Sequence, residues 1–301
     1  MKIVILGAGA VGLSLAARLS ARCDLLALCR PKHAAIINRS GFHMEGIWGS
    51  GIFHFSASAT IPDKSSFDYC LITAKSLQTR QLCQEHAQLL AHCDCVSLQN
   101  GIGNEEIISE FSERVIGGTI ITGFEWCGDA HVNVTVEAGP IRLGRFPAGI
   151  DNSVQRLIDL FRDAGLNVEG SNAIRGNLWA KTLYNCALNP LGAILDVAYG
   201  DLARTPTWSI IEHIVAEAYA VCRAEGVALP WRSHLEYLAY LKSVQLPATA
   251  SHHSSMLQDI RNHKKTEIDF INGAVVRLAA QHGIATPVNR TLVDMIAFKS
   301  S

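Results

Sequence analysis

The stretch Lys2-Ile-Val-Ile-Leu-Gly-Ala-Gly-Ala-Val-Gly12 decides the fold of this 301-residue chain. An apolar, β-rich run leads directly into glycines spaced G-x-G-x-x-G and then into a helical pattern, which is the order of a dinucleotide-binding βα unit. In such a unit Gly7 allows a tight turn, Gly9 lets the backbone approach a pyrophosphate, and Gly12 lets helix and strand pack closely. The helix start offers its N–H groups to the phosphates. The stretch therefore predicts a cofactor site formed by Gly7, Ala8, Gly9, Ala10, Val11 and Gly12, with a merely structural glycine turn as the competing interpretation.

A second strand, predicted over residues 24–28, ends without the carboxylate that an NAD-binding chain places near the ribose hydroxyls. Arg30 follows this strand instead, with Lys32 close by. A guanidinium can hold a 2′-phosphate through two hydrogen bonds and stack on adenine. Arg30 therefore predicts NADP(H) rather than NAD as the cofactor, whereas Lys32 fits a solvated basic turn equally well.

Two later apolar runs, residues 69–73 and 95–98, predict buried parallel strands. Lys75 follows the first strand and Asn100 follows the second. Because ligands of doubly wound sheets bind beyond the carboxyl ends of the strands, we expect both side chains to meet cofactor or substrate. For Asn100 a structural role competes, since Asn-Gly is a common turn dipeptide.

The remaining N-terminal sequence continues an α/β pattern. Residues 41–61, rich in glycine, predict hairpins or irregular strands without evident chemistry. Further strands of the same sheet are predicted at 115–122, 132–137 and 141–144, a helix at 151–164, and an edge strand at 166–168. Residues 1–170 are thus predicted to form an NADP-binding Rossmann-type domain with a doubly wound sheet.

Beyond residue 170 strand signals nearly vanish. Helical periodicity covers residues 174–195, 207–225, 231–243, 254–282 and 288–298, with glycines and prolines between these segments. Residues 171–301 are therefore predicted to form an all-helical domain that binds substrate and performs catalysis.

The composition describes a compact protein, with 49% hydrophobic and 18% charged residues. A formal net charge of -1 and a sequence pI near 6.9 give no general electrostatic reason to bind nucleic acid or an anionic membrane. The nine cysteines lack the paired spacing of a zinc site and predict free thiols, most of them buried, in a reducing compartment. We expect a cytoplasmic location, because the first apolar run is too short for a signal peptide and no later stretch approaches a membrane span. No metal site is predicted, since the adjacent His252 and His253 lack the spacing of a helical ligand pair.

One predicted helix carries an unusual polar face. Lys181, Asn185 and Asn189 recur at intervals of four residues within an otherwise apolar segment, so one ammonium and two amides share one side. Asn is a poor helix former, whereas solvated stripes usually contain Glu, Lys, Gln and Arg. The pattern favours a polar pocket wall over a solvent face. Such a group of side chains suits binding and protonation of a small oxyanionic or hydroxylated molecule.

Glu267 is the second candidate for chemistry. If residues 254–282 form one unbroken helix, Glu267 lies within an apolar stripe, where a carboxylate is unusual. It would then be paired with a cation, for which Lys181 is the obvious candidate, or face a cleft; a helix break near His263 would instead turn it outward. Ser255, near the predicted helix start, suits either helix capping or carboxylate binding.

Four separated blocks of the sequence resemble ketopantoate reductases, and the resemblance spans essentially the whole chain. The blocks are the turn at residues 7–12, Lys75 with Gln99-Asn100-Gly101, the run from Trp179 to Pro190, and the run from Ser254 to Gly273. The resemblance implies reduction of 2-dehydropantoate to (R)-pantoate with NADPH, a step toward pantothenate and coenzyme A. It further implies that Lys181 is the proton donor and that Glu267 and Ser255 hold substrate. By the same likeness Asn100, Asn185 and Asn189 line that pocket, and Arg30 and Lys75 lie on the NADP side.

Two positions depart from the family pattern. His252 and Tyr199 each stand where the family commonly has Asn facing substrate. The resemblance therefore implies the reaction type more firmly than the keto acid. A related NADP-dependent 2-keto or β-hydroxy acid dehydrogenase is one alternative, and a non-catalytic NADP-sensing module that acts on a protein partner is another. The sequence is compatible with a homodimer and leaves the oligomeric state open.

Overall fold

A computed structural model describes residues 1–300 and separates them into two compact units. Unit 1 contains residues 1–99 and 104–174, and unit 2 contains residues 100–103 together with the chain from 175 onward. The short segment 100–103 therefore belongs to unit 2 although it follows a strand of unit 1. This differs from the sequence-based prediction, in which segment 100–103 belongs to the first domain and the boundary lies near residue 170.

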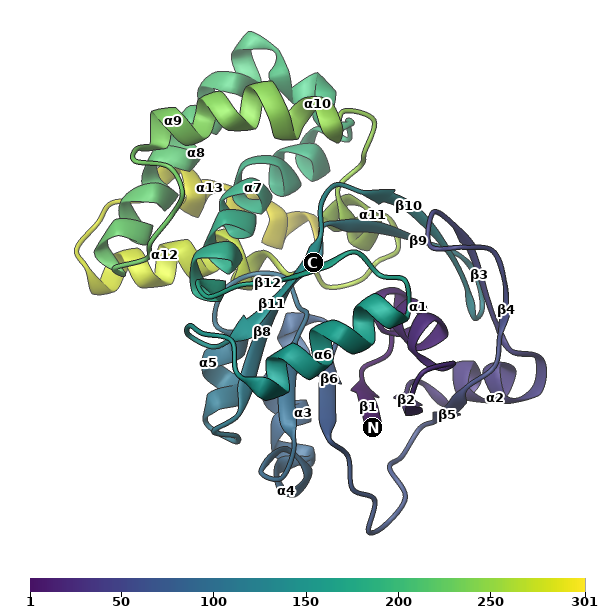
Figure 1. Cartoon of the computed structure of the whole chain (residues 1–301). Helices are drawn as coiled ribbons and strands as arrows, with labels where there is room; N and C mark the ends of the chain where they lie inside the picture. Colours follow the sequence, from purple (N-terminus) through teal and green to yellow (C-terminus); the bar gives the residue numbers. More distant parts are fainter. Residues whose placement is uncertain (301) are drawn as a thin grey trace. The chain divides into compact units, whose positions relative to one another are not determined.

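Unit 1 is built on an eight-stranded sheet with the order β12-β11-β8-β7-β6-β1-β2-β5 (Figure 1). Its strands are β1 (Lys2–Leu6), β2 (Asp24–Leu28), β5 (Ser56–Ser58), β6 (Tyr69–Ile72), β7 (Asp94–Ser97), β8 (Val115–Thr119), β11 (Ile141–Arg145) and β12 (Val168–Gly170). Neighbouring strands pair in parallel except where β8 meets β11. The chain leaves β1 in one direction through β2 and returns to build the other side from β6. This reversal makes the carboxyl ends of β1 and β6 the ligand-binding position of an open α/β sheet.

Both faces of this sheet are covered. In β1, Ile3 and Ile5 belong to one hydrophobic core cluster and Val4 and Leu6 to another, which explains why the strand is apolar at every position after Lys2. The first cluster includes side chains of α1 (Ala10–Leu19), α2 (Pro31–Ser40) and α6 (Asn152–Asp163). The second includes side chains of α3 (Thr79–Glu85), α4 (Ala87–Leu90) and α5 (Asn104–Ser109). The predicted doubly wound α/β fold is confirmed. An edge strand is present, but β12 covers Val168–Gly170 and shares only Val168 with the predicted range 166–168.

A second sheet of four strands has the order β4-β3-β10-β9. Its strands are β3 (Phe42–Gly46), β4 (Gly51–Phe53), β9 (Thr122–Gly128) and β10 (His131–Glu137). The prediction that residues 132–137 extend the main sheet is wrong, because β10 pairs with β9 and β3. Strand propensity indicates that a segment is extended but not which strand it pairs with. Val132 and Val134 belong to the first core cluster although they lie in this separate sheet.

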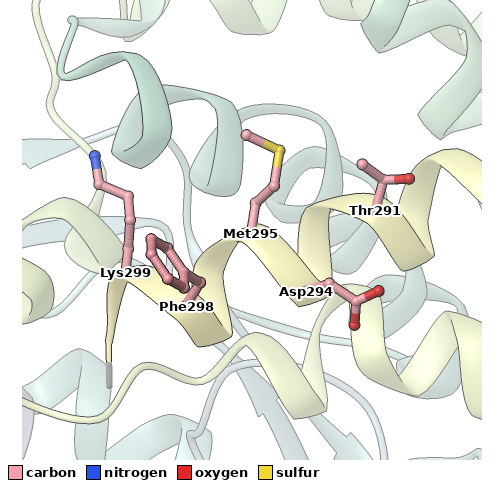
Figure 2. Close-up of a pocket in the computed structure, with 5 residues that line it drawn as sticks. All are labelled: Thr291, Asp294, Met295, Phe298 and Lys299. Carbon is pink, nitrogen blue, oxygen red and sulfur yellow. The ribbon is translucent and has the colours of Figure 1, made fainter.

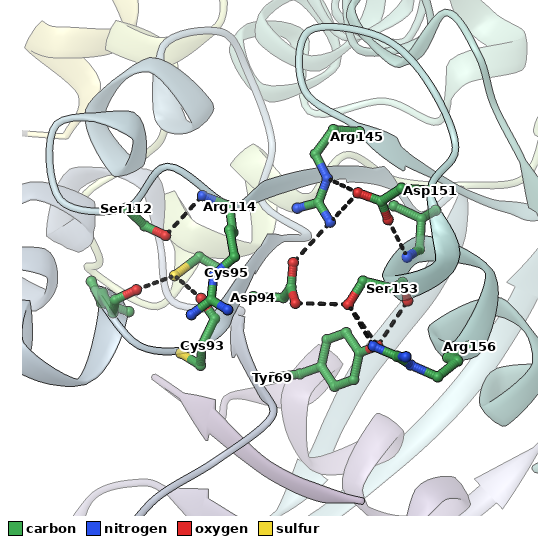
Figure 3. A network of polar contacts seen from close by, with 12 residues as sticks. Tyr69, Cys93, Asp94, Cys95, Ser112, Arg114, Arg145, Asp151, Ser153 and Arg156 are labelled. Atoms are coloured by element: carbon green, nitrogen blue, oxygen red, sulfur yellow. Dashed lines mark hydrogen bonds and ion pairs between the residues drawn. The ribbon is translucent and has the colours of Figure 1, made fainter.

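A polar network at the amino end of β7 joins three elements of unit 1 (Figure 3). The carboxylate of Asp94 accepts a hydrogen bond from Ser153 Oγ at 2.7 Å and forms an ion pair with Arg145 at 2.8 Å. Arg145 also pairs with Asp151, which caps α6 by accepting a hydrogen bond from Val154 N at 2.9 Å. Because Asp94 is buried, these contacts offset the cost of removing its charge from water. The network fixes α6 against β7 and β11, at the opposite end of β7 from Gln99.

Unit 2 is helical, as predicted. Its main helices are α7 (Ile174–Leu195), α8 (Thr205–Ala224), α9 (His234–Tyr240), α10 (Leu246–Ala248), α11 (Ser255–Arg261), α12 (Asn272–Gln281) and α13 (Pro287–Lys299). Short helical turns η2 (Tyr199–Ala203), η3 (Leu241–Gln245) and η4 (Ile268–Phe270) connect some of them. The assumption of one helix over 254–282 is wrong, because the chain leaves the helix after Arg261 and His263 adopts a positive φ of 51°. The run Asn262-His-Lys-Lys265 combines poor helix formers with like charges, which explains the break.

None of the helices in the described part of the chain has both the length and the apolar character needed to cross a membrane. All nine cysteines are free, six of them buried, as predicted.

Candidate functional site

The glycine turn between β1 and α1 is shaped by close packing on the loop after β6. Gly7 has a positive φ of 68°, and a Cβ there would lie 2.2 Å from the Cβ of Ala74. A Cβ on Gly12 would lie 2.3 Å from Thr73 Oγ1. Any side chain at either position would displace the neighbouring loop, so the protein itself requires both glycines.

Gly9 differs from these two glycines. Its φ is -86°, which any residue can adopt, and a Cβ there would meet only the carbonyl oxygen of Gly7, at 3.9 Å. Packing within the described residues thus gives no reason for glycine at this position, and the space beside it suits the close approach of a ligand. Gly9 is also the N-cap of α1, where it has no side chain to cap the helix, and no acidic residue stands in the first turn. The turn therefore fits a cofactor pyrophosphate, because it leaves the N–H groups and positive dipole end of α1 to an anion.

The two basic residues after β2 have different surroundings. Arg30 is exposed at the N-cap of α2, with its Nη2 3.5 Å from His33 Nε2. Lys32 forms an ion pair with Asp129, and the distance from Nζ to Oδ2 is 2.6 Å. The pKa of the Asp129 carboxyl group is lowered, mainly by the hydrogen bond from Lys32. This ion pair favours the basic-turn interpretation for Lys32. Arg30 is the better candidate for a nucleotide phosphate.

Lys75, half-buried, stands at the start of η1 (Ser76–Gln78) and follows β6. Its loop is held by buried amides: Gln99 Nε2 donates to the carbonyl oxygen of Ala74 and to Thr79 Oγ1, both at 2.8 Å. Thr79 Oγ1 in turn donates to Asn104 Oδ1 at 2.9 Å. The sequence analysis assigns no role to Thr79 or Asn104, because such a network depends on contacts between segments far apart in the chain. Its consequence is a fixed position for the backbone that carries Lys75.

The polar face of α7 is enclosed, as predicted. Asn185 is 6% and Asn189 4% exposed, and Lys181 is half-buried. Asn189 Oδ1 accepts a hydrogen bond from the hydroxyl of Tyr199. The amide nitrogen of Asn185, by contrast, is buried without a hydrogen-bond partner anywhere in residues 1–300. A buried donor in that state costs about 1–3 kcal/mol, so it marks a position where a ligand oxygen could bind.

A second buried network sets the course of α7. Pro190 lies inside the helix and has no N–H to donate to the carbonyl oxygen of Cys186. Asn272 Nδ2 takes that place, donating to Cys186 O at 3.2 Å and to Asn289 Oδ1 at 2.9 Å. Asn289 Nδ2 donates in turn to Glu217 Oε2 at 2.7 Å. These contacts tie α7 to α12, α13 and α8, and they hold the helix that carries Lys181, Asn185 and Asn189.

Glu267 points inward despite the helix break. It is 5% exposed, immediately before η4, and its Oε2 accepts a hydrogen bond from Asn100 Nδ2 at 3.0 Å. The break near His263 therefore does not turn the carboxylate outward, contrary to the alternative considered from the sequence. Asn100 reaches it because segment 100–103 packs within unit 2: Ile102 N donates to Phe270 O at 2.8 Å. Gly101 has a φ of 86°, so Asn100 also begins the tight turn that the Asn-Gly pair indicates.

The capping role at the start of α11 belongs to Ser254, whose Oγ accepts a hydrogen bond from Leu257 N at 3.0 Å. Ser255, half-buried, is the first helical residue and is not the N-cap. Capping is therefore not the reason for a hydroxyl at position 255.

Tyr199 and His252, which stand where the resemblance leads us to expect asparagines, lie together. The rings of Tyr199 and His252 are 5.5 Å apart, and Tyr199 N donates to His252 O at 3.0 Å. The ring of Tyr184 also packs against Tyr199, at a centroid separation of 5.8 Å. Burial raises the pKa of Tyr199 well above its usual value, so the phenol stays protonated and donates to Asn189 near neutral pH. Tyr199 therefore contacts the Asn189 amide directly, and His252 packs against Tyr199.

A separate open pocket lies along α13 (Figure 2). It is lined by Thr291, Asp294, Met295, Phe298 and Lys299. Phe298 is 83% exposed, and Lys299 donates to the carbonyl oxygens of Ala193 and Ile194 near the end of α7. The pocket contains none of the predicted site residues and lacks the inward-facing amides and carboxylate described above.

Comparison with protein families gives matches across both units. The family described as "Ketopantoate reductase PanE/ApbA" matches residues 3–148, and "Ketopantoate reductase PanE/ApbA C terminal" matches residues 173–300. The 2-dehydropantoate 2-reductase of Pyrococcus horikoshii is 35% identical over 312 aligned positions, covering 100% of this chain and 98% of the relative.

Two solved structures show the same fold over the full chain. A PanE/ApbA family ketopantoate reductase from Ralstonia eutropha matches with a TM-score of 0.89 at 30% identity, covering 100% of this chain and 98% of that chain. A D-mandelate dehydrogenase, solved with NADH and anilino(oxo)acetate, matches with a TM-score of 0.91 at 28% identity and the same coverage. The fold thus serves proteins named for different acids, ketopantoate in one and mandelate in the other.

Proposed function

Because the chain belongs to the ketopantoate reductase family, we propose that it reduces 2-dehydropantoate to (R)-pantoate with NADPH. The polar face of α7 carries this proposal: a half-buried ammonium and two buried amides stand one helical turn apart, and one amide lacks a protein partner within residues 1–300. Such a face suits a ligand with a carboxylate, a carbonyl and a hydroxyl group.

Lys181 acts as the proton donor. A bound nicotinamide would supply hydride to the keto carbon, and negative charge would then develop on the carbonyl oxygen. The ammonium of Lys181 stabilises that charge and transfers a proton to the oxygen, which yields the 2-hydroxy acid. The amide nitrogen of Asn185 donates to a substrate oxygen, which satisfies its otherwise missing hydrogen bond.

Glu267, the second proposed catalytic residue after Lys181, holds the substrate. Its carboxylate accepts hydrogen bonds, and one is already supplied by Asn100 at 3.0 Å. A substrate hydroxyl would donate another, so Asn100 fixes the carboxylate in the orientation that receives the substrate. Ser255 offers a hydroxyl to the substrate carboxylate. This role is supported by the fact that Ser254, and not Ser255, caps α11.

The cofactor site is assigned to unit 1. The turn at residues 7–12 receives the pyrophosphate, Arg30 the 2′-phosphate, and Lys75 the nicotinamide side of NADP. The open space at Gly9 and the exposed guanidinium of Arg30 support this assignment. Residues 1–170 are accordingly proposed as the NADP-binding domain and residues 171–301 as the substrate domain.

A second substrate assignment is supported by Tyr199. The Tyr199 hydroxyl donates a hydrogen bond to the side-chain oxygen of Asn189. The rings of His252 and Tyr184 pack against the Tyr199 ring and form an aromatic group with it. Asn189 thus has less hydrogen-bonding capacity for a hydroxylated substrate, and apolar surface stands beside it. This arrangement suits a related 2-keto acid with a larger or aromatic side chain, in keeping with the D-mandelate dehydrogenase fold match.

The deciding experiment is a panel of 2-keto acids assayed with NADPH and NADH in parallel. The proposal expects the highest kcat/KM with 2-dehydropantoate and NADPH. A clearly higher kcat/KM with an aromatic keto acid such as phenylglyoxylate would select the second assignment. Tight NADPH binding without reduction of any keto acid would support a sensing module and refute both.

A further inference from the structure

Two imidazoles and a carboxylate meet on the outer face of the four-stranded sheet. His43 and Glu45 are two residues apart on β3 and so share one face, while the alternating residues Phe42 and Met44 are fully buried on the other. His131 stands on β10 directly opposite His43. Residues 41–61 show no chemistry in the sequence because the third member of the cluster, His131, lies 86 positions beyond Glu45.

The three side chains are already close to one another. The rings of His43 and His131 stack with centroids 4.0 Å apart and planes 18° apart. His131 Nε2 lies 3.1 Å from Glu45 Oε1. One ligand atom from each residue can be chosen so that all lie within 4.8 Å of one another.

We propose that His43, Glu45 and His131 bind a divalent transition metal ion of the zinc type. Tetrahedral zinc with bonds of about 2.1 Å places its ligand atoms roughly 3.4 Å apart. The His131–Glu45 pair is within a few tenths of an ångström of that spacing, and rotation of the exposed His43 brings in the third ligand. Because the ligands come from paired strands, the backbone positions are fixed before the metal binds.

The chemistry of the donors selects zinc over calcium or magnesium. Two imidazoles with one carboxylate suit zinc, whereas calcium and magnesium require mostly oxygen ligands. Cys127 stands on the neighbouring strand β9, next to Gly128, the partner of His131. Three protein ligands leave the fourth zinc position open to solvent, since Glu45 is 42% and His131 25% exposed.

Calorimetric titration of the full, chelator-treated chain with Zn²⁺ tests this site. Wild type is expected to bind one equivalent, and Zn²⁺ should raise its Tm, because an ion that binds only the folded state stabilises it. The double variant His43→Ala/His131→Ala should lose both effects. Glu45→Gln, which keeps the size of the side chain, should weaken zinc binding at least about tenfold, and excess Mg²⁺ should not compete.

The matched control is His54→Ala/His92→Ala, which removes two exposed imidazoles elsewhere in unit 1. It should retain the stoichiometry and the Tm increase of wild type. The assignment is overturned if wild type binds no zinc, or if the two double variants lose binding equally. Retained binding in both the cluster variant and Glu45→Gln would also overturn it.

Discussion

The glycine turn of unit 1 and the polar face of α7 in unit 2 each have one feature that the protein does not use internally. In the glycine turn this feature is the open space beside Gly9, where an added Cβ would meet only one atom, at 3.9 Å. At Gly7 and Gly12, by contrast, an added Cβ would clash with Ala74 and Thr73. On the α7 face it is a donor, because Asn189 is engaged by Tyr199 and the amide nitrogen of Asn185 has no partner in the described chain.

The difference matters for how each region is tested. A small added group can block unused space without disturbing the fold, whereas removal of an unused buried donor should improve folding and impair binding.

The largest effect is expected for Lys181→Ala. Loss of the proton donor and of the charge on the α7 face should lower kcat/KM about 1,000-fold, within the range for a general acid that also stabilises an oxyanion. The dissociation constant of NADPH, measured by fluorescence titration, should change little if cofactor binding belongs to unit 1. Lys242→Ala, which removes an exposed lysine from unit 2, is the control and should keep near-normal activity. An unimpaired Lys181→Ala enzyme would remove the central residue of the proposed mechanism.

Gly9→Ala should come next, with a loss of about 30-fold in affinity for both NADPH and NADH. The added methyl group would occupy the space proposed for the pyrophosphate, and the φ of -86° at Gly9 is compatible with alanine. Gly139→Ala is a suitable control, because a Cβ there has no atom within 4 Å and φ is not positive. Equal affinities of the two variants and wild type would make the turn purely structural.

Arg30→Ala should lower the affinity for NADPH about tenfold and leave that for NADH unchanged, since one exposed guanidinium–phosphate contact is lost. Lys32→Ala should have a smaller effect, because Lys32 is already paired with Asp129. Equal losses for the two nucleotides, or a wild-type preference for NADH, would contradict the role given to Arg30.

The glycine turn and the main sheet could be predicted because their determinants are local. A strand, three glycines and a helix within 20 residues define the turn, and the run from 174 to 195 has the bounds of α7 itself. Propensity could not assign β10 to its sheet, since its partners depend on residues 42–46 and 122–128. Likewise, the spacing of Asn185 and Asn189 indicates a shared face but not that Tyr199, ten residues beyond Asn189, satisfies only one of them.

Glu267 shows how a correct expectation can follow from a wrong premise. Its inward position was inferred from an unbroken helix, yet the helix ends at Arg261 and the carboxylate is buried by the turn before η4. The apolar character of the flanking Ile268 and Ile271, both buried, was the informative signal. The hydrogen bond from Asn100 could not be predicted, because it requires segment 100–103 to pack with unit 2.

The smallest effects should separate the two asparagines of α7. Asn185→Leu, which keeps the branched shape of the side chain and removes its polar atoms, should raise the free energy of unfolding by about 1 kcal/mol, because a buried donor without a partner is lost. The same change should lower kcat/KM about fivefold if that donor binds substrate. Asn189→Leu should instead destabilise the protein by about 1–2 kcal/mol, since the buried hydroxyl of Tyr199 would lose its acceptor. Urea unfolding followed by fluorescence, together with kinetics on the preferred keto acid, measures both quantities. If Asn185→Leu is less stable than wild type and equally active, the Asn185 amide stabilises the fold and does not bind substrate. The proposed difference between Asn185 and Asn189 would then be wrong.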